Sequence, residues 1–146
     1  MKYTIKVTVN VSRDRFLELF ESLEFMKQWQ PALEKLEHFE GEKGENGAVS
    51  YLHYKENGKP SVIKETIINK QLPNTFDFLY EADGVTNYAY NQFIDQGDST
   101  TWIATHQFKF SLKLFFLNLM KKAFTTQTTK DMEAFKAAAE KMNINK

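Results

Sequence analysis

Residues 112–143 have the sequence LKLFFLNLMKKAFTTQTTKDMEAFKAAAEKMN, which contains neither glycine nor proline. Those two residues are the strongest helix breakers, so the stretch predicts one long helix. Its weak point is TTQTT at 125–129, because β-branched threonine forms helix poorly and could bend or break it there. We expect this helix to fill the concave face of any curved sheet that the rest of the chain forms, since no other element is large enough.

Upstream of this stretch, segments rich in Val, Ile, Thr, Tyr and Phe alternate with turns. The turns are GEKGENG (41–47), ENGKP (56–60), QLPN (71–74), ADG (82–84) and DQGD (95–98). Asn-Gly and Asp-Gly are strong signals for tight turns, so we expect six strands joined in an antiparallel meander. Residues 2–11 alternate polar and apolar side chains and predict a further, half-buried strand.

Two short helices are expected between the first strand and the meander. Ser12 is a candidate N-cap, Asp14 follows in the first turn, and apolar residues recur at helical spacing from Phe16 onward. A second short helix fits residues 24–29, and Pro31 ends it. The expected fold is therefore α+β: one domain of residues 1–146, with a curved sheet of about seven antiparallel strands around a long C-terminal helix.

This order of elements resembles the helix-grip fold of the START-like (SRPBCC) superfamily, which includes the birch-pollen-allergen family and polyketide cyclase/dehydrase-like proteins. The resemblance is carried by VTVNVSRDRFLELF (7–20), MKQWQPALEKLE (26–37), NGAVSYLHY (46–54), LPNTFDF (72–78) and KDMEAFKAAAE (130–140). These segments are signatures of the fold and not of a catalytic site. The resemblance implies an apolar cavity between sheet and helix. Members of the superfamily bind lipids, sterols or polyketides, catalyse cyclisation, or act as protein-binding adaptors.

The composition excludes several classes of function. Lys and Arg number 19 and Asp and Glu number 19, and a dedicated nucleic-acid-binding protein carries a basic excess, so we expect no nucleic-acid partner. Because the chain contains no cysteine, a disulfide, a thiolate nucleophile and a cysteine-based zinc site are all excluded. We find no phosphate-binding glycine loop, nucleophile elbow or metal-ligand histidine spacing, and expect neither cofactor nor metal. The start of the sequence does not resemble a signal peptide, so a cytoplasmic location is expected.

Aromatic strands supply the candidate cavity lining. In TFDFLYEA (75–82) the apolar side chains alternate with acidic ones, which predicts that Phe76, Phe78 and Tyr80 point inward. In TWIATHQFKF (101–110) the face of Trp102 is the larger apolar set, and burying it places His106 inside the cavity or at its rim. The predicted ligand-binding residues are Trp29, Phe76, Phe78, Tyr80, Trp102, His106, Phe108, Met120 and Phe124.

Two residues, His106 and Glu65, are candidates for moving protons. His106 is either a hydrogen-bonded core histidine or a group that binds ligand or transfers protons. Glu65 shares a strand face with Ile63 and Ile67, and if that face points inward, its carboxyl has a raised pKa. The opposite face carries Lys64, so alternation does not decide between them.

The inward faces of the other polar strands also stay open. In strands 48–55 and 85–94, both faces carry mixtures of aromatic and polar side chains, and either could face the helix. On the C-terminal helix, Asp131 and Glu133 are expected to be solvated.

The most apolar passage is SLKLFFLNLMKKAF, residues 111–124. It is shorter than the roughly 20 apolar residues that a bilayer span requires, and it contains lysines, so it cannot cross a membrane. It either packs between the sheet and the short helices, or it leaves Phe115 and Phe116 exposed for weak contact with a membrane surface or a second copy of the chain.

These features favour a small binding protein that holds an apolar ligand, such as a lipid, sterol-like or polyketide-like molecule, between sheet and helix. One alternative is an enzyme of the cyclase or dehydratase type, which would use His106 or Glu65 on a bound hydrophobic substrate. Another is an adaptor whose cavity is filled by its own side chains and whose outer surface binds a protein or a membrane.

Overall fold

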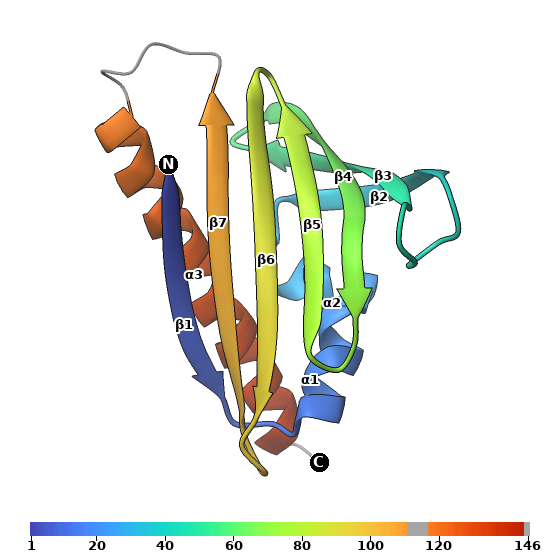
Figure 1. Ribbon diagram of the computed structural model, residues 1–146, viewed down its shortest axis with the longest axis vertical. Coiled ribbons are helices and arrows are strands. Elements are labelled where there is room, and N and C mark those ends of the chain that lie inside the picture. The colour runs from blue at the N-terminus through green and yellow to red at the C-terminus, as the bar shows by residue number, and fades with distance from the viewer. Residues whose placement is uncertain (111–116, 145–146) are drawn as a thin grey trace.

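The computed structural model describes residues 1–110 and 117–144 (Figure 1). The elements in chain order are β1 (Lys2–Val9), α1 (Arg13–Phe20), α2 (Leu23–Trp29), β2 (Leu33–Glu40), β3 (Val49–Glu56), β4 (Lys59–Gln71), β5 (Thr75–Ala82), β6 (Val85–Asp95), β7 (Thr100–Phe110) and α3 (Leu117–Ile144). Within the described residues the seven strands form one sheet in the order β1-β7-β6-β5-β4-β3-β2, and every neighbouring pair is antiparallel. The expected helix-grip architecture is confirmed.

The three helices lie on the concave side of the sheet. Figure 1 shows β1, β7, β6, β5 and β4 running side by side, while β2 and β3 turn across them at one edge. Helix α3 runs along the sheet behind β1 and β7, and α1 and α2 lie beside its C-terminal half on the same side. All three described helices therefore cover the same face of the curved sheet, its concave face.

Helix α3 is continuous through the TTQTT segment, so the break that its threonines could have caused does not occur. Thr129 Oγ1 donates to the carbonyl of Thr125 at 2.9 Å, and the hydroxyls of Thr128 and Tyr3 hydrogen-bond at 2.7 Å. The bond between Thr128 and Tyr3 is a tertiary contact that holds this part of α3 against β1, whereas the bond of Thr129 lies within the helix and does not stabilise it. Residues 115 and 116, on which the predicted exposed apolar contact depends, lie outside the described residues.

Serine caps start both short helices, and the prediction for Ser12 is confirmed. Ser12 Oγ accepts a hydrogen bond from Arg15 N at 3.3 Å, and Ser22 Oγ accepts one from Phe25 N at 3.0 Å. Each bond satisfies a backbone donor that has no partner within its own helix. Because the first turn of α1 is fixed in this way, its apolar face is directed at the sheet.

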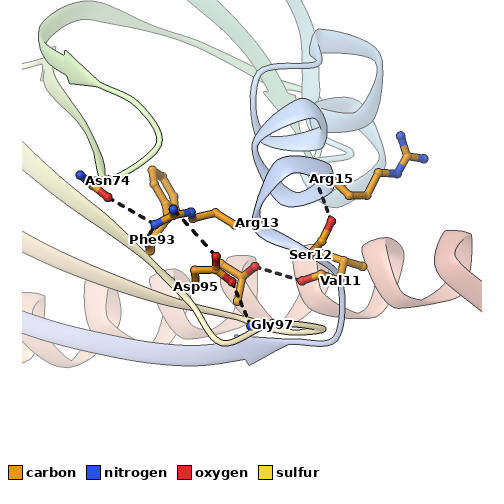
Figure 2. A network of polar contacts seen from close by, with 9 residues as sticks. Val11, Ser12, Arg13, Arg15, Asn74, Phe93, Asp95 and Gly97 are labelled. Carbon is orange, nitrogen blue, oxygen red and sulfur yellow. Dashed lines mark hydrogen bonds and ion pairs between the residues drawn. The ribbon is translucent and has the colours of Figure 1, made fainter.

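Arg13 connects the start of α1 to the end of β6 and to the turn between β4 and β5 (Figure 2). Its guanidinium donates to Asn74 Oδ1 at 3.3 Å and to the carbonyl of Phe93 at 3.2 Å, and it lies 4.0 Å from the carboxylate of Asp95. Asp95 in turn accepts from the backbone N–H of Gly97, where the chain has φ +81° and makes the turn between β6 and β7. One side chain thus holds α1, β6 and the β4–β5 turn in a fixed relation.

Phe135 of α3 lies at the centre of the core and is fully buried. The rings around it are those of Phe16, Phe20, Phe25, Trp29 and Trp102, with centroid distances between 4.7 and 6.3 Å. They come from α1, α2 and β7, so this one side chain joins three elements to the helix. Aromatic pairs at such distances contribute energy beyond the area that they bury.

We expect Phe135→Ala to lower the free energy of unfolding by about 3–5 kcal/mol, because it opens a cavity where rings from several elements meet. Phe39→Ala is the matched control, since Phe39 is 64% exposed on β2 and its removal should change stability by about 0.5 kcal/mol or less. Urea denaturation of the three proteins measures both values. Equal losses in the two variants would show that the core does not depend on Phe135.

Candidate functional site

A cavity of about 660 Å³ lies between the concave face of the sheet and the helices. Its walls come from the inward side chains of β3, β4, β5, β6 and β7, from α2, and from one face of α3 around Phe124, Thr128 and Asp131. Cavities of about 300–1,000 Å³ are typical of sites for small organic molecules. The lining is mainly apolar, with a small number of polar groups.

Most of the residues predicted to bind a ligand line this cavity. They are Trp29, Phe76, Phe78, Tyr80, Trp102, His106, Phe108 and Phe124. Phe124 stacks on Phe108 at 4.6 Å and on Phe110 at 6.0 Å, where it covers one end of β7. Met120 is half-buried one helical turn before Phe124, and it is not among the described residues that form the lining.

The strand faces that alternation left open are defined by the structure. Ser50, Leu52 and Tyr54 of β3 face the cavity, and so do Asn87, Ala89 and Asn91 of β6. On β4 the inward face is that of Ile63, Glu65 and Ile67. Each of these inward faces carries polar side chains that line the cavity. Because a buried face is recognised in the sequence by its apolar residues, their alternation alone could not identify these faces.

Glu65 is a buried carboxyl in the middle of the sheet. It pairs with Ser50 on β3 and with Tyr80 on β5, and the Tyr80 hydroxyl hydrogen-bonds its carboxyl group. Burial raises the pKa of Glu65 to about 7, and the bond from Tyr80 offsets only part of that rise. The group therefore changes its protonation state near neutral pH, in contact with a cavity that can hold a ligand.

Tyr54 and Tyr80 flank this carboxyl, and the role of Tyr54 was not predicted. The Tyr54 hydroxyl donates to Gln30 Oε1 at 2.7 Å, which leaves its oxygen free to accept a hydrogen bond. Burial raises the pKa of both phenols, and the negative charge of Glu65 raises both further. Both hydroxyls are therefore protonated at neutral pH. Tyr54 was missed because either face of β3 could have pointed inward.

Asp131 of α3 also lines the cavity, and the expectation that it is solvated was wrong. Its side chain is half-buried, accepts a hydrogen bond from Gln127 Nε2 at 2.8 Å, and has a pKa raised chiefly by burial. It lies on the helical face of Phe124 and Thr128, which packs against β1 and the cavity. Spacing from Thr128 could have placed it there. Glu133, two residues further, is exposed as expected.

His106 lines the cavity at its β7 wall as a neutral imidazole. Burial lowers its pKa to about 4, and its Nδ1 lies 3.1 Å from Asn87 Nδ2 and 3.2 Å from Asn87 Oδ1. Its ring stacks on Tyr3 with a centroid distance of 5.3 Å. The amide partner was not predicted, although the inward position was. His53 and His38 lie away from the cavity, beside Glu37 and the carbonyl of Gly41.

Trp102 is fixed by a buried polar network. Its indole N–H donates to Asn91 Oδ1 at 2.9 Å, while Asn91 Nδ2 donates to the carbonyl of Phe76 at 2.9 Å. The backbone N–H of Asn91 donates to Asp77 Oδ1 at 3.0 Å. Trp102 therefore supports the fold as well as the cavity wall. The buried indole N–H of Trp29 has no partner within the described residues.

The described residues include neither a cluster that could hold a metal ion nor a helix that could span a membrane. In residues 1–110 and 117–144, no group of three or more His, Cys, Asp or Glu side chains is placed to hold a metal ion. No helix in the same residues is both long enough and apolar enough to cross a bilayer.

Solved structures with this fold cover almost the whole chain. The crystal structure of Ara h 8.0201 aligns with a TM-score of 0.81 and 14% identity, over 97% of this chain and 98% of that one. A START superfamily protein from Mycobacterium smegmatis aligns with a TM-score of 0.78 and 14% identity, over 97% and 98%. The Zhui aromatase/cyclase from Streptomyces aligns with a TM-score of 0.76 and 15% identity, over 96% and 93%. At these identities the similarity establishes the fold alone.

Sequence comparison extends this result from the fold to a family. No curated protein matches the chain in sequence. Residues 1–80, which are more than half of the chain, match the family described as Pathogenesis-related protein Bet v 1 family. The matched part runs from β1 to Tyr80 and includes both short helices and the strand that carries Glu65. The resemblance inferred from the sequence is confirmed, and the chain belongs to the Bet v 1 family.

Proposed function

We propose that the protein binds one apolar, ring-containing or acyl molecule in the cavity between the sheet and α3. The cavity of about 660 Å³ carries this proposal, since a fold that needed only a packed core would fill such a volume with its own side chains. Its size also counts against the alternative of an adaptor with a filled cavity. Membership of a family whose fold is associated with hydrophobic ligands supports the same conclusion.

The lining offers a suitable surface for such a ligand. On β5 the ring of Phe78 stacks on Phe76 at 4.5 Å and on Tyr80 at 5.6 Å, which gives a continuous aromatic surface. Burying apolar ligand atoms there contributes roughly 25 cal/mol per Å². The hydroxyl of Tyr80, the imidazole of His106 and the carboxyl of Glu65 can then orient the polar part of the ligand.

A second candidate function is proton transfer on a bound hydrophobic substrate, as in a cyclase or dehydratase. The observation in its favour is that two titratable side chains line the same cavity. Burial raises the pKa of Glu65 to about 7, and His106 is a neutral imidazole. A general acid or base works best when its pKa lies near the working pH. The similar fold of an aromatase/cyclase is consistent with this candidate.

Binding in the cavity can be tested by filling it. Ser50→Trp places an indole beside Glu65, and we expect at least about tenfold weaker binding of the uncharged fluorophore Nile red, measured by fluorescence titration. His53→Trp adds the same side chain to the outer face of β3 and should leave the affinity within about twofold. Trp102→Ala is a poorer test, because it also breaks the bond to Asn91. Equal affinities in the two tryptophan variants would place the binding elsewhere.

Catalysis predicts a different result from binding alone. If the protein turns over a poly-β-ketone substrate, Glu65→Gln and His106→Ala should each lower kcat by about 10²–10⁴-fold, the usual contribution of a general acid or base. Product formation followed by liquid chromatography measures this effect, with Glu133→Gln as the control on exposed helix surface. Unchanged rates in both cavity variants would eliminate the enzymatic candidate.

The protonation of Glu65 predicts how stability depends on pH. Burial raises its pKa to about 7 from 4.5, so the folded state keeps a proton that the unfolded chain releases. Stability from this group is lost as the pH rises between those values, and Glu65→Gln should remove that loss. We expect the variant to be more stable than the parent at pH 8 by about 3 kcal/mol at most, with the difference fading below about pH 5.

Urea denaturation across this pH range measures the difference between the two proteins. The titration of His106 occurs in both and cancels. Glu133→Gln serves as the control, because that carboxyl is exposed and its replacement should give no comparable pH dependence. A stability difference that does not vary with pH would contradict the raised pKa of Glu65.

A further inference from the structure

Four polar side chains form a row across the concave face of the sheet. Ser50 of β3 pairs with Glu65 of β4, and Glu65 pairs in turn with Tyr80 of β5. Tyr80 then pairs with Asn87 of β6, and all four residues line the cavity. Directly opposed residues of neighbouring strands project from the same face of a sheet, so these side chains lie next to one another. His106 of β7 extends the row, because its Nδ1 lies 3.1 Å from Asn87 Nδ2.

The side chains that flank this row on β3, β4, β5 and β6 are apolar. They lie two positions along each strand from the row and therefore on the same face. They are Leu52, Ile63, Ala82 and Val85 on one side, and Ala48, Ile67, Phe78 and Ala89 on the other. Burying a polar group costs free energy unless it is hydrogen-bonded, so a packed core would have apolar side chains in the row as well. The row is therefore the part of this surface that suits the polar groups of a ligand.

Most other polar side chains of the described lining already have partners. The pairs are Tyr54 with Gln30 at 2.7 Å, Thr128 with Tyr3 at 2.7 Å, Asp131 with Gln127 at 2.8 Å, Glu21 with Lys70 at 2.9 Å, Asn91 with Trp102 at 2.9 Å, and Glu81 with Lys64 at 4.0 Å. Lys43 and Asp83 are exposed in loops. On the concave face of the sheet, the row and His106 are therefore the groups best placed to bond a ligand.

Glu65 and Tyr80 offer a ligand one donor and one acceptor. The Tyr80 hydroxyl is hydrogen-bonded to the Glu65 carboxyl, and its oxygen can still accept a hydrogen bond. Burial raises the pKa of Glu65 to about 7, so below that pH the carboxyl is protonated and its O–H can donate. A ligand hydroxyl both donates and accepts, and it can therefore satisfy both groups. A ligand carboxylate only accepts, so it would leave one of them without a partner.

Asn87 and His106 offer the same combination. Burial lowers the pKa of His106 to about 4, so its imidazole is neutral, with one nitrogen as donor and the other as acceptor. If Asn87 Nδ2 donates to His106 Nδ1, the imidazole Nε2–H remains as donor and Asn87 Oδ1 as acceptor. If His106 Nδ1 instead donates to Asn87 Oδ1, the Nε2 remains as acceptor and the amide N–H as donor. In both arrangements a hydroxyl is the matching ligand group.

The two pairs are separated by a distance that the sheet defines. Glu65 and Tyr80 lie on β4 and β5, whereas Asn87 and His106 lie on β6 and β7. The pairs are thus centred two strands apart, which is about 10 Å at the usual spacing between strands. A lipid with one polar head group would satisfy only one pair and would leave the other buried against its apolar part.

We propose that the ligand of this cavity is a flat, ring-containing molecule with a hydroxyl near each end. Glu65 and Tyr80 bind one hydroxyl, Asn87 and His106 bind the other, and the rings lie against the apolar side chains that flank the row. This inference rests on the proposed binding function and narrows its ligand class from apolar molecules in general to diols whose hydroxyls are about 10 Å apart.

Three probes that share a biphenyl skeleton test the inference. In para,para′-biphenol the hydroxyls are separated by about two strand spacings, while para-phenylphenol lacks one hydroxyl and hydroxybiphenyl carboxylic acid has a carboxyl in its place. At about pH 6 both phenols are uncharged and the acid is ionised. Isothermal titration calorimetry measures each affinity for the full-length protein. We expect biphenol to bind at least about tenfold more tightly than either other probe.

Variants assign this preference to the two pairs. Tyr80→Phe removes one hydroxyl from the first pair, and Asn87→Leu removes the amide of the second. Each should reduce the preference for biphenol over phenylphenol from at least about tenfold to about twofold, since one hydroxyl then has a poorer partner. Gln92→Leu, an exposed change on the same strand as Asn87, should keep the preference. A thermal melt checks that each variant is folded, and His106→Phe replaces Asn87→Leu if that variant is not.

The outcomes separate this inference from the binding function itself. If phenylphenol or the acid binds as tightly as biphenol, the cavity accepts a ligand but the diol inference fails. If Tyr80→Phe and Asn87→Leu keep the preference for biphenol, the two pairs do not bind its hydroxyls and the inference is also refuted. If no biphenyl probe binds although Nile red does, only the diol inference is contradicted. If Nile red does not bind either, both proposals are contradicted.

Discussion

The packing of Phe135 against rings from α1, α2 and β7 is the contact on which the rest of the structure depends. A strongly curved sheet has an apolar concave face that water would otherwise reach, and only α3 is long enough to cover it. The aromatic cluster fixes the C-terminal half of α3 against the sheet. Among the described residues, the other half is held chiefly by the contacts of Tyr3 with Thr128 and of Phe108 with Phe124.

This division of α3 explains why the cavity lies where it does. Around Phe135 the space between sheet and helix is filled by the rings of α1 and α2. Beyond them, the cavity is bounded by the inward faces of β3, β4 and β5 and by the face of α3 around Thr128 and Asp131, and the lining there includes Tyr54, Glu65 and Tyr80. The dense core at one end permits the opening at the other, because the rings supply burial that the cavity walls do not.

Sequence patterns identified the elements well and the polar part of the cavity poorly, for a physical reason. Turn chemistry and helix breakers act locally, so the meander, the caps and the long helix could be predicted without knowing any partner. The inward faces of β3, β4 and β6 could not, since alternation identifies a buried face by its apolar residues. At these strands the inward face carries Tyr54, Glu65 and Asn87, whose positions depend on neighbours far away in sequence. Asp131 was misplaced because an acidic residue on a helix is ordinarily exposed.

The choice of a carboxyl at position 65 is itself evidence about function. Nothing in the fold requires it, since a glutamine of the same shape would also offer an oxygen to the Tyr80 hydroxyl, without the cost of burying an ionisable group. What the carboxyl adds is a group that takes up or releases a proton near neutral pH, beside a cavity that can hold a ligand. The same reasoning applies to Asp131, a half-buried carboxyl of α3 that lines the same cavity. Two ionisable groups on the walls of one cavity fit a site that orients its ligand through polar groups, since a packed core would carry uncharged side chains at such positions.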